Sequence, residues 1–240
     1  MNQQMTGQLQ VASASRRGIH SHNGDAAATH RVPGTEVVGA AVVDGIGNSP
    51  DVAEFAWLAA QVAARVGART TATLGILAAA ELNAAPAASD IETDGVAVVA
   101  VAEPGSTSIA WTGDCRAYGW TGEKLELRTT DDTIGEYLRA HGVPVDVAAQ
   151  HDDRLRTSLG RSTVATVHFV VIEDRLVVLT SDGVHDSVPH EALEVLVLTH
   201  QDDPQALADA IVEAACENGK GYRDDATAVV MLRPRPMMSY

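Results

Sequence analysis

The sequence has little cysteine, little lysine and few aromatic residues, and these shortages exclude several classes of protein. Its 2 cysteines, Cys115 and Cys216, each stand in apolar surroundings without a second cysteine or a histidine at metal-ligand spacing. This excludes a disulfide-stabilised scaffold and a zinc finger, and we expect both thiols to be buried and unpaired. Aromatic residues make up only 4% of the chain, so we expect a core built mainly from Ala, Val, Leu and Ile.

The sequence also shows no segment that would direct a protein into or across a membrane. No uninterrupted apolar run reaches the ~18 residues of a membrane-spanning helix, and the polar opening Met1–Gln10 has no apolar core after a basic stretch. We therefore expect a cytoplasmic protein without a membrane partner.

Positive charge is scarce relative to negative charge. The chain has 17 Lys and Arg residues against 32 Asp and Glu residues, a formal charge of -15, and lysine occurs only at Lys124 and Lys220. Such a field repels nucleic acid and anionic membranes, so neither is expected as a partner. With 45% apolar residues, the 240-residue chain can bury a sizeable core.

The apolar segments that are present have the lengths and spacing of strands and helices. Strands are predicted at 37–43, 95–102, 107–113, 116–120, 124–128, 164–172, 175–180 and 226–232. Helices are predicted at 52–82 (one helix, or two separated near 67–73), 133–141, 189–199 and 204–218, and loops at 85–94 and 142–161. Short turns favour an antiparallel meander over 95–128 and a hairpin about Glu173 and Asp174.

These segments indicate a single domain. Strands, then helices, then a closing strand are typical of an α+β fold in which antiparallel sheets pack together and helices cover them. No repeat or linker divides the chain. We therefore predict one domain over residues 17–233, preceded by a flexible arm over 1–16 and followed by a short tail over 234–240.

Three short aspartate motifs lie next to apolar, β-branched runs. Asp44 and Gly45 follow one run, Asp182 follows a second, and Asp224 precedes a third. A single Asp-Gly step is usually only a turn. Carboxylates at strand ends beside tight glycine turns are nevertheless what a hard cation needs, because Mg²⁺ and Mn²⁺ take oxygen ligands. The three motifs together predict a metal-dependent hydrolase.

Seven motifs, in order from about Gly18 to Leu232, resemble those of the metal-dependent protein serine/threonine phosphatases, the type 2C or PPM-type family, in their compact bacterial form. They are Asn23-Gly24-Asp25, Asp44-Gly45-Ile46-Gly47, Gly113-Asp114-Cys115-Arg116-Ala117-Tyr118, Thr130-Asp131-Asp132-Thr133, Ser158-Leu159-Gly160, Ser181-Asp182-Gly183-Val184-His185-Asp186 and Asp224-Asp225-Ala226-Thr227. The resemblance implies a four-layer αββα sandwich with two antiparallel sheets flanked by helices. It also implies hydrolysis of phosphoserine and phosphothreonine by a metal-bridged water, on phosphorylated protein substrates, in a monomer.

The resemblance also implies which residues hold the ions, two or three Mn²⁺ or Mg²⁺. Asp44 would bridge two ions, with the carbonyl of Gly45 on the second and the carboxylates of Asp182 and Asp224 on the first. Asp131 and Asp186, together with Asp182, match the positions of a third, weaker ion. Asp114 is expected to be structural, because a Gly-Asp step between two strands is ordinary hairpin chemistry.

Several positions depart from the family's pattern. His20 stands where the family has an arginine that grips the substrate phosphate, and histidine is only partly charged at neutral pH. His20→Arg is therefore expected to raise turnover efficiency on a phosphopeptide. Gly24 replaces a Glu or Gln that serves the second ion, so Asp25 would act there through waters. Asn48 replaces a glycine, and the segment matching the family's mobile flap, residues 142–156 (the flap), is short and acidic.

The departures leave two functions open. One is an active phosphatase, and the other is a pseudophosphatase that binds or scaffolds phosphoproteins with little hydrolysis. Asp44, Asp182 and Asp224 favour chemistry, because three converging carboxylates without cations would repel one another. The absence of the family's arginine at position 20 and of its Glu or Gln at position 24 favours impaired hydrolysis. The remaining histidines do not have zinc-ligand spacing, and His185 is expected to be partly buried and hydrogen-bonded.

Overall fold

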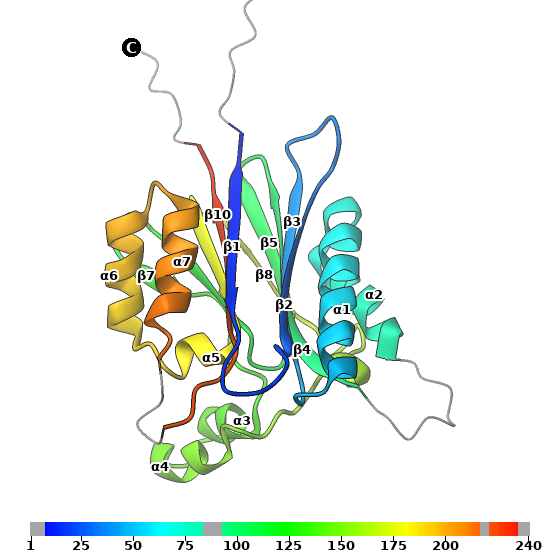
Figure 1. Ribbon diagram of the computed structural model, residues 1–240, viewed down its shortest axis with the longest axis vertical. Coiled ribbons are helices and arrows are strands. Elements are labelled where there is room, and N and C mark those ends of the chain that lie inside the picture. Colours follow the sequence, from blue (N-terminus) through cyan, green and yellow to red (C-terminus); the bar gives the residue numbers. More distant parts are fainter. Residues whose placement is uncertain (1–7, 84–92, 217–220, 235–240) are drawn as a thin grey trace, which may run out of the picture.

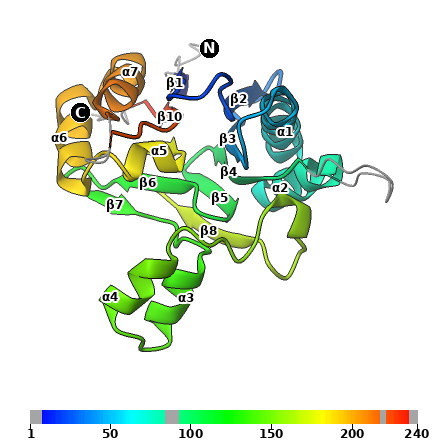
Figure 2. The ribbon, with the colours of Figure 1, turned by 60° about the horizontal axis from the view of Figure 1, so that its bottom comes forward.

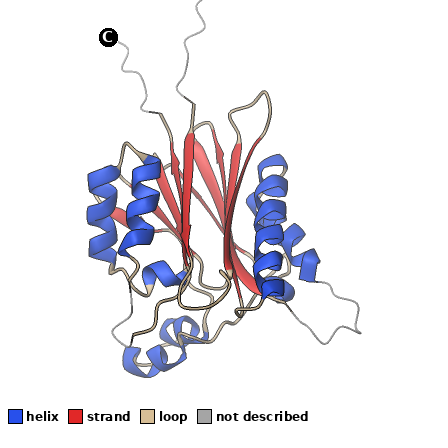
Figure 3. Ribbon diagram, in the orientation of Figure 1, coloured by secondary structure: helices blue, strands red, loops and turns tan. Residues whose placement is uncertain are grey.

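The computed structural model describes residues 8–83, 93–216 and 221–234. Two antiparallel sheets of five strands each pack face to face (Figures 1 and 3). The first sheet has the order β1 (Gln10–Arg16), β10 (Ala226–Leu232), β9 (Leu176–Thr180), β6 (Arg116–Trp120) and β7 (Leu125–Leu127). The second has the order β2 (Asp25–Arg31), β3 (Val38–Gly45), β4 (Gly95–Glu103), β5 (Ser106–Thr112) and β8 (His168–Ile172).

Helices cover the outer face of each sheet. The second sheet is covered by α1 (Pro50–Arg69) and α2 (Ala72–Ala80), and the first by α6 (His190–His200) and α7 (Pro204–Ala214) (Figure 1). Three short helices, α3 (Ile134–Ala140), α4 (Val145–Ala148) and α5 (Asp182–His185), lie at the lower end of the sandwich, where Figure 2 shows α3 and α4 standing away from both sheets. The predicted four-layer αββα sandwich is confirmed.

Three apolar clusters form the core, one between the sheets and one beneath each pair of helices. The helix-covered face of the second sheet is rich in alanine, which allows close approach. A Cβ at Gly39 of β3 would overlap the carbonyl oxygen of Ala64 on α1, so this contact needs glycine. The expectation of a core of small aliphatic residues is met.

The predicted helix over 52–82 is two helices that meet at Thr70 and Thr71. The Thr71 side chain accepts a hydrogen bond from the Leu74 amide at 3.2 Å and so caps α2. Glycine lets the two helices pack closely, because a Cβ at Gly75 would lie 2.6 Å from the Ala63 carbonyl oxygen. The predicted loop 142–161 contains α4 and two 3₁₀ turns, η2 (Ala149–His151) and η3 (Leu159–Arg161); another, η1 (Glu81–Asn83), follows α2.

The predicted flexible arm over 1–16 is wrong for its second half. Residues 10–16 form β1, which pairs with β10 along its whole length, from Gln10 opposite Leu232 to Arg16 opposite Ala226. The sequence of β1 has a weak apolar pattern, and the strand is stabilised by a partner more than 200 residues away in the chain. Residues 1–7 and most of the predicted tail lie outside the described residues, as does most of the predicted loop 85–94.

The predicted meander and hairpin are also wrong. β4 pairs with β5, and β6 with β7, but β5 and β6 belong to different sheets. Similarly, β8 lies on β5 and β9 lies between β6 and β10. Turn residues mark where a strand ends, but they do not decide whether the next strand joins the same sheet.

Cys115 is buried as expected, but Cys216 is exposed because it follows α7 at the surface. The helix predicted over 204–218 ends at Ala214. Within residues 8–83, 93–216 and 221–234, no helix is long and apolar enough to cross a membrane.

Candidate active site

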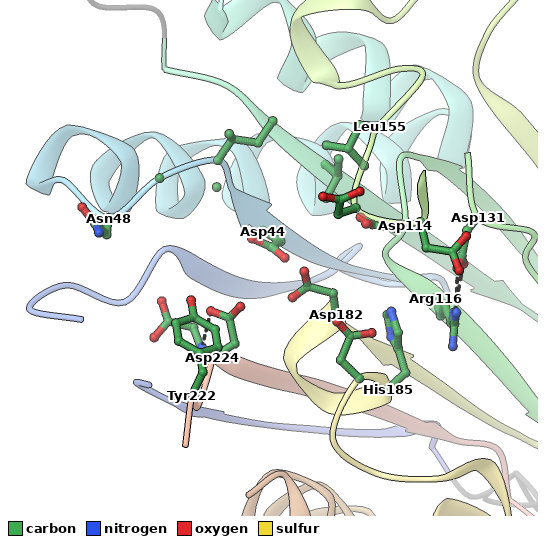
Figure 4. Close-up of a pocket in the computed structure, with 18 of the residues that line it drawn as sticks. Asp44, Asn48, Asp114, Arg116, Asp131, Leu155, Asp182, His185, Tyr222 and Asp224 are labelled. Atoms are coloured by element: carbon green, nitrogen blue, oxygen red, sulfur yellow. Dashed lines mark hydrogen bonds and ion pairs between the residues drawn. The ribbon is translucent and has the colours of Figure 1, made fainter. Parts of the chain in front are cut away.

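A pocket of about 760 Å³ opens at the lower end of the sandwich, and carboxylates from both sheets line it (Figure 4). The alternating strand directions explain this gathering. β3 and β5 end at this end of the molecule, β6 and β10 start there, and β9 ends there and runs into α5. The carboxylates that line the pocket from these connections are Asp44, Asp114, Asp182 and Asp224.

Asp44 and Asp25 stand opposite each other on β3 and β2. The Gly45 amide donates to the Gly24 carbonyl at 3.0 Å, which continues the pairing past Asp44. A Cβ at Gly24 would lie 3.2 Å from the Gly45 carbonyl oxygen. With glycine at position 24, no side chain there crowds the oxygen that is predicted to face the second ion.

Asp182 is the first residue of α5, at the point where β9 ends. The preceding Ser181 is buried and fixes this junction, since its amide donates to the Thr227 carbonyl at 3.1 Å and its hydroxyl donates to Asp25 at 2.6 Å. A Cβ at Gly183 would overlap the carbonyl of Asp225, so glycine is needed for α5 to start against β10.

Asp225 is a buried structural carboxylate beside Asp224. Its Oδ1 accepts from the Gly18 amide and its Oδ2 from the Gly24 amide, both at 2.6 Å. The connection between β1 and β2 is thereby fastened to the segment before β10. The side chain of Asp224 faces the pocket and also accepts from the Asp225 amide at 2.9 Å.

The pKa values show how strongly these carboxylates interact. Burial raises the pKa of Asp44 well above its usual range, and the charges of Asp182 and Asp25 raise it further. Burial likewise raises the pKa of Asp182, with added repulsion from Asp114 and Asp25. Asp44 and Asp182 point toward each other in Figure 4. Facing carboxylates favour the uptake of a proton when no cation is present.

Asp25 lies behind this pair and is buried. Its burial raises its pKa to about 7, although hydrogen bonds from Ser181 and Thr227 oppose the rise. It does not line the pocket, so its predicted action on an ion through waters stays a prediction.

The predicted third-ion residues come from two parts of the pocket lining: Asp131 lies away from Asp224 in Figure 4, and Asp186 follows α5, one turn after Asp182. Both oxygens of Asp131 accept from the guanidinium of Arg116, at 2.9 Å and 2.6 Å, in a bidentate ion pair. Asp186, at the end of α5, is exposed at the pocket wall. The third-ion role of these two carboxylates stays a prediction.

Sequence reasoning missed Asp114 as a pocket residue. It lies between β5 and β6, and because these strands are in different sheets, the Gly-Asp step crosses from one sheet to the other beside the pocket. Burial raises the pKa of Asp114 to about 6, and the charge of Asp131 adds to the rise. The sequence feature that could have identified Asp114 is its position at the end of a predicted strand, which Asp44 and Asp182 share.

His185 lies half-buried in the wall, with Nδ1 3.5 Å from the hydroxyl of Thr180, as expected of a partly buried histidine. Burial and the neighbouring Arg116 lower its pKa well below the usual value, so it is neutral. His20 lies at the pocket mouth, where Nε2 is 3.1 Å from the hydroxyl of Tyr222 and Nδ1 is 3.1 Å from the amide nitrogen of Asn48.

The donors at the pocket fit a hard divalent cation. They are carboxylate oxygens with a nearby backbone carbonyl, and sulfur does not line the pocket. Within the described ranges, no group of three or more Asp, Glu, His or Cys side chains is arranged so that it could hold a metal ion by itself. Mg²⁺ keeps several waters and is commonly held through one or two carboxylates, so an open arrangement of this kind suits it.

Comparison with solved structures supports the fold, whereas no protein-family model and no curated protein matches the sequence. Among solved structures, the S. agalactiae serine/threonine phosphatase superposes with a TM-score of 0.82 and 15% identity, over 94% of this chain and 100% of that chain. The phosphatase Stp1 from Staphylococcus aureus superposes with a TM-score of 0.75 and 18% identity, over 98% and 99%.

A third structure is the catalytic domain of the serine/threonine protein phosphatase PstP in complex with 2 manganese ions. It has a TM-score of 0.71 and 21% identity, over 93% of this chain and 97% of that chain. This chain has the fold of the bacterial serine/threonine phosphatases. The resemblance of the seven sequence motifs thus extends to the arrangement of both sheets.

Proposed function

We propose that this protein is a metal-dependent protein serine/threonine phosphatase that removes phosphate from phosphoserine and phosphothreonine in protein substrates. The observation that carries the proposal is the pair of facing carboxylates, Asp44 and Asp182, which arise from different sheets. Burial raises the pKa of both groups, and the charge of Asp182 adds to the rise at Asp44. Such a pair costs stability unless cations or protons are bound. The fold shared with phosphatases, one of them solved with manganese, supports the same reading.

In this proposal the pocket residues hold two Mn²⁺ or Mg²⁺ ions. Asp44 would hold both ions, the Gly45 carbonyl would hold one of them, and Asp182 and Asp224 would hold the other. Asp131 and Asp186 are the candidates for a third ion, and Asp114 joins them because of its place in the pocket. When bound, the ions neutralise the phosphoryl charge and lower the pKa of a water that attacks the phosphorus.

Other residues of the chain orient these ligands, and acidic side chains pair with the arginines that line the pocket. Ser181 and the buried Asp25 hold the start of α5 against β2 and β3. The pocket's two arginines are already paired, Arg116 with Asp131, and Arg139 with Glu136 and Asp152. With carboxylates outnumbering free cationic groups among the described pocket residues, a phosphate dianion would be repelled unless metal ions are bound. Substrate binding as well as hydrolysis should therefore depend on the cation.

The finer features of the proposal follow from the sequence. The net charge of -15 favours substrates with basic residues near the phosphorylated position, through long-range attraction. A monomer acting in the cytoplasm, without nucleic acid as a partner, is part of the same proposal.

The deciding experiment is hydrolysis of a phosphothreonine peptide with Mn²⁺, with Mg²⁺ and with EDTA. We expect turnover only with a cation, and none in Asp182→Asn. Asp209→Asn, which changes an exposed aspartate on α7, is the matched control and should keep full activity. A folded protein that binds the phosphopeptide equally with Mn²⁺ and with EDTA, and hydrolyses it with neither, would instead be a pseudophosphatase.

A further inference from the structure

A chain of polar contacts crosses the mouth of the pocket. His20 comes from the connection between β1 and β2, Asn48 from the turn after β3, and Tyr222 from the segment before β10. His20 lies between the other two, with its ring nitrogens 3.1 Å from the Asn48 amide nitrogen and 3.1 Å from the Tyr222 hydroxyl. The rings of His20 and Tyr222 also meet edge to face, with centroids 5.8 Å apart.

The contacts continue from Tyr222 to a metal-ligand candidate. The Tyr222 hydroxyl is hydrogen-bonded to Asp224, and Figure 4 shows the two side chains next to each other. The donors and acceptors run in one direction. The side-chain Nδ2 of Asn48 can only donate, so Nδ1 of His20 accepts from it. Nε2 of His20 then carries the proton and donates to the Tyr222 oxygen, which leaves the Tyr222 hydrogen for the Asp224 carboxylate.

The loop that carries His20 is held in place independently. The Ile19 amide donates to the Arg223 carbonyl at 3.0 Å, and the Gly18 amide donates to Asp225 at 2.6 Å. A Cβ at Gly18 would overlap the Arg223 carbonyl oxygen, which shows how closely the two segments approach. His20 therefore stands on a fixed backbone, from which it can orient Tyr222.

We propose that His20 is a positioning residue, which acts with Asn48 through Tyr222 to hold Asp224 in the orientation that binds a metal ion. This inference rests on the proposed metal-dependent function. It differs from the phosphate-gripping role suggested by the sequence, because both ring nitrogens of His20 already have partners. Groups hydrogen-bonded to metal ligands commonly affect metal affinity by about 10–100-fold.

The two roles of His20 give different results on substitution. A phosphate grip affects the KM for a phosphopeptide and leaves metal affinity unchanged. The chain of contacts from Asn48 through His20 and Tyr222 to Asp224, called the bridge below, affects metal affinity first. His20→Arg separates them further, because a guanidinium has no acceptor for the Asn48 amide, so the bridge predicts weaker Mn²⁺ binding rather than faster turnover.

The test is calorimetric titration of Mn²⁺ into the wild-type protein, His20→Ala, Tyr222→Phe and the double variant, with no substrate present. Each single change is expected to weaken Mn²⁺ binding by about 10-fold. The double variant should be no weaker than the weaker single one, because both changes break the same chain of contacts. His20→Gln, which keeps a donor toward Tyr222, should recover part of the affinity.

His22→Ala is the matched control, since His22 lies in the same loop and contacts Ser21 rather than the bridge. Urea unfolding of each variant checks that the fold is intact. Unchanged Mn²⁺ affinity in His20→Ala, or additive losses in the double variant, would overturn the bridge while leaving the phosphatase proposal standing. A wild-type protein that binds no Mn²⁺ would overturn both.

Discussion

Asp182 illustrates how one residue can limit stability while supporting function. It faces Asp44 across the pocket, and burial and neighbouring charges raise the pKa of both groups in the metal-free protein. An amide at position 182 could donate to Asp44 without taking up a proton. The carboxylate is therefore unfavourable for folding and favourable only when a cation occupies the pocket.

We predict that Asp182→Asn raises the melting temperature of the metal-free protein at neutral pH. Relief worth about 1 kcal/mol corresponds to a rise of about 2–4 °C for a domain of this size. Thermal unfolding in EDTA, followed by circular dichroism, measures it. The same variant should gain less from added Mn²⁺ than the wild type, and a fall in its metal-free melting temperature would contradict the argument.

Asp114 shows why the residues of the candidate site could be predicted only in part from the sequence. Asp44, Asp182 and Asp224 were recognisable because each adjoins an apolar run that had to be a strand. Asp114 adjoins strands too, but its Gly-Asp step has the sequence of a hairpin turn. Its role depends on β5 and β6 joining different sheets, which is a property of long-range pairing rather than of local sequence.

At the scale of elements, Asp132 is one of the residues that attach the flap to the rest of the molecule, beside Ile134, whose amide donates to the Arg154 carbonyl at 2.7 Å. The buried carboxylate of Asp132 accepts from Arg156 at 2.9 Å and from the hydroxyl of Thr157, and His168 lies 3.6 Å from it. The Arg156 amide also donates to the Asp132 carbonyl at 2.8 Å. Asp132 thus holds Arg156, the last residue of the flap, through both its side chain and its backbone carbonyl.

Asp132→Asn is expected to loosen this attachment, because it removes the charge that faces Arg156 while keeping the side chain's shape. Since Arg156 is partly exposed, we expect a loss of about 1–2 kcal/mol in the free energy of unfolding, measured with urea. The KM for a phosphopeptide should rise as well.

Asp146→Asn is the control for this change, since Asp146 is exposed on α4 in the same flap. It should alter neither the unfolding free energy nor the KM. Equal effects of the two substitutions would mean that Asp132 does not anchor the flap.

Elements with strong local patterns were predictable and those that depend on distant partners were not. The segments that form β3, β4 and β10 are nearly continuous runs of Val and Ala, and their positions were predicted from the sequence. β1 was missed because its residues Ser13 and Ser15 interrupt the apolar pattern, and β10 supplies its hydrogen bonds. The assignment of strands to sheets failed for the same reason.

At the scale of the whole molecule, the buried carboxylates make metal-free stability depend on pH. The pKa of Asp25 is raised to about 7 and that of Asp114 to about 6, in both cases mainly by burial. Groups whose pKa is higher in the folded state bind more protons when folded, so unfolding releases protons between about pH 4 and pH 7. Stability is therefore greatest at the acidic end of this range and falls as pH rises through it.

We expect the melting temperature in EDTA to be lower at about pH 8 than at about pH 5, by several degrees. Excess Mn²⁺ should remove most of this difference, because the cation replaces the protons between the carboxylates. Differential scanning calorimetry at both pH values, with and without Mn²⁺, measures the effect. A melting temperature that rises with pH in EDTA would show that other groups dominate.

The end of the sandwich opposite the pocket has a different character. Its turns between β2 and β3, β4 and β5, and β6 and β7 contain Gly34, Gly105 and Gly122, whose φ angles are 76°, 91° and 98°. A Cβ at any of the three would meet nothing within 4 Å. Extra sequence inserted at these turns would extend into solvent, far from the carboxylates. The fold thus provides three attachment points where a recruiting or sensing module could be added without disturbing the pocket.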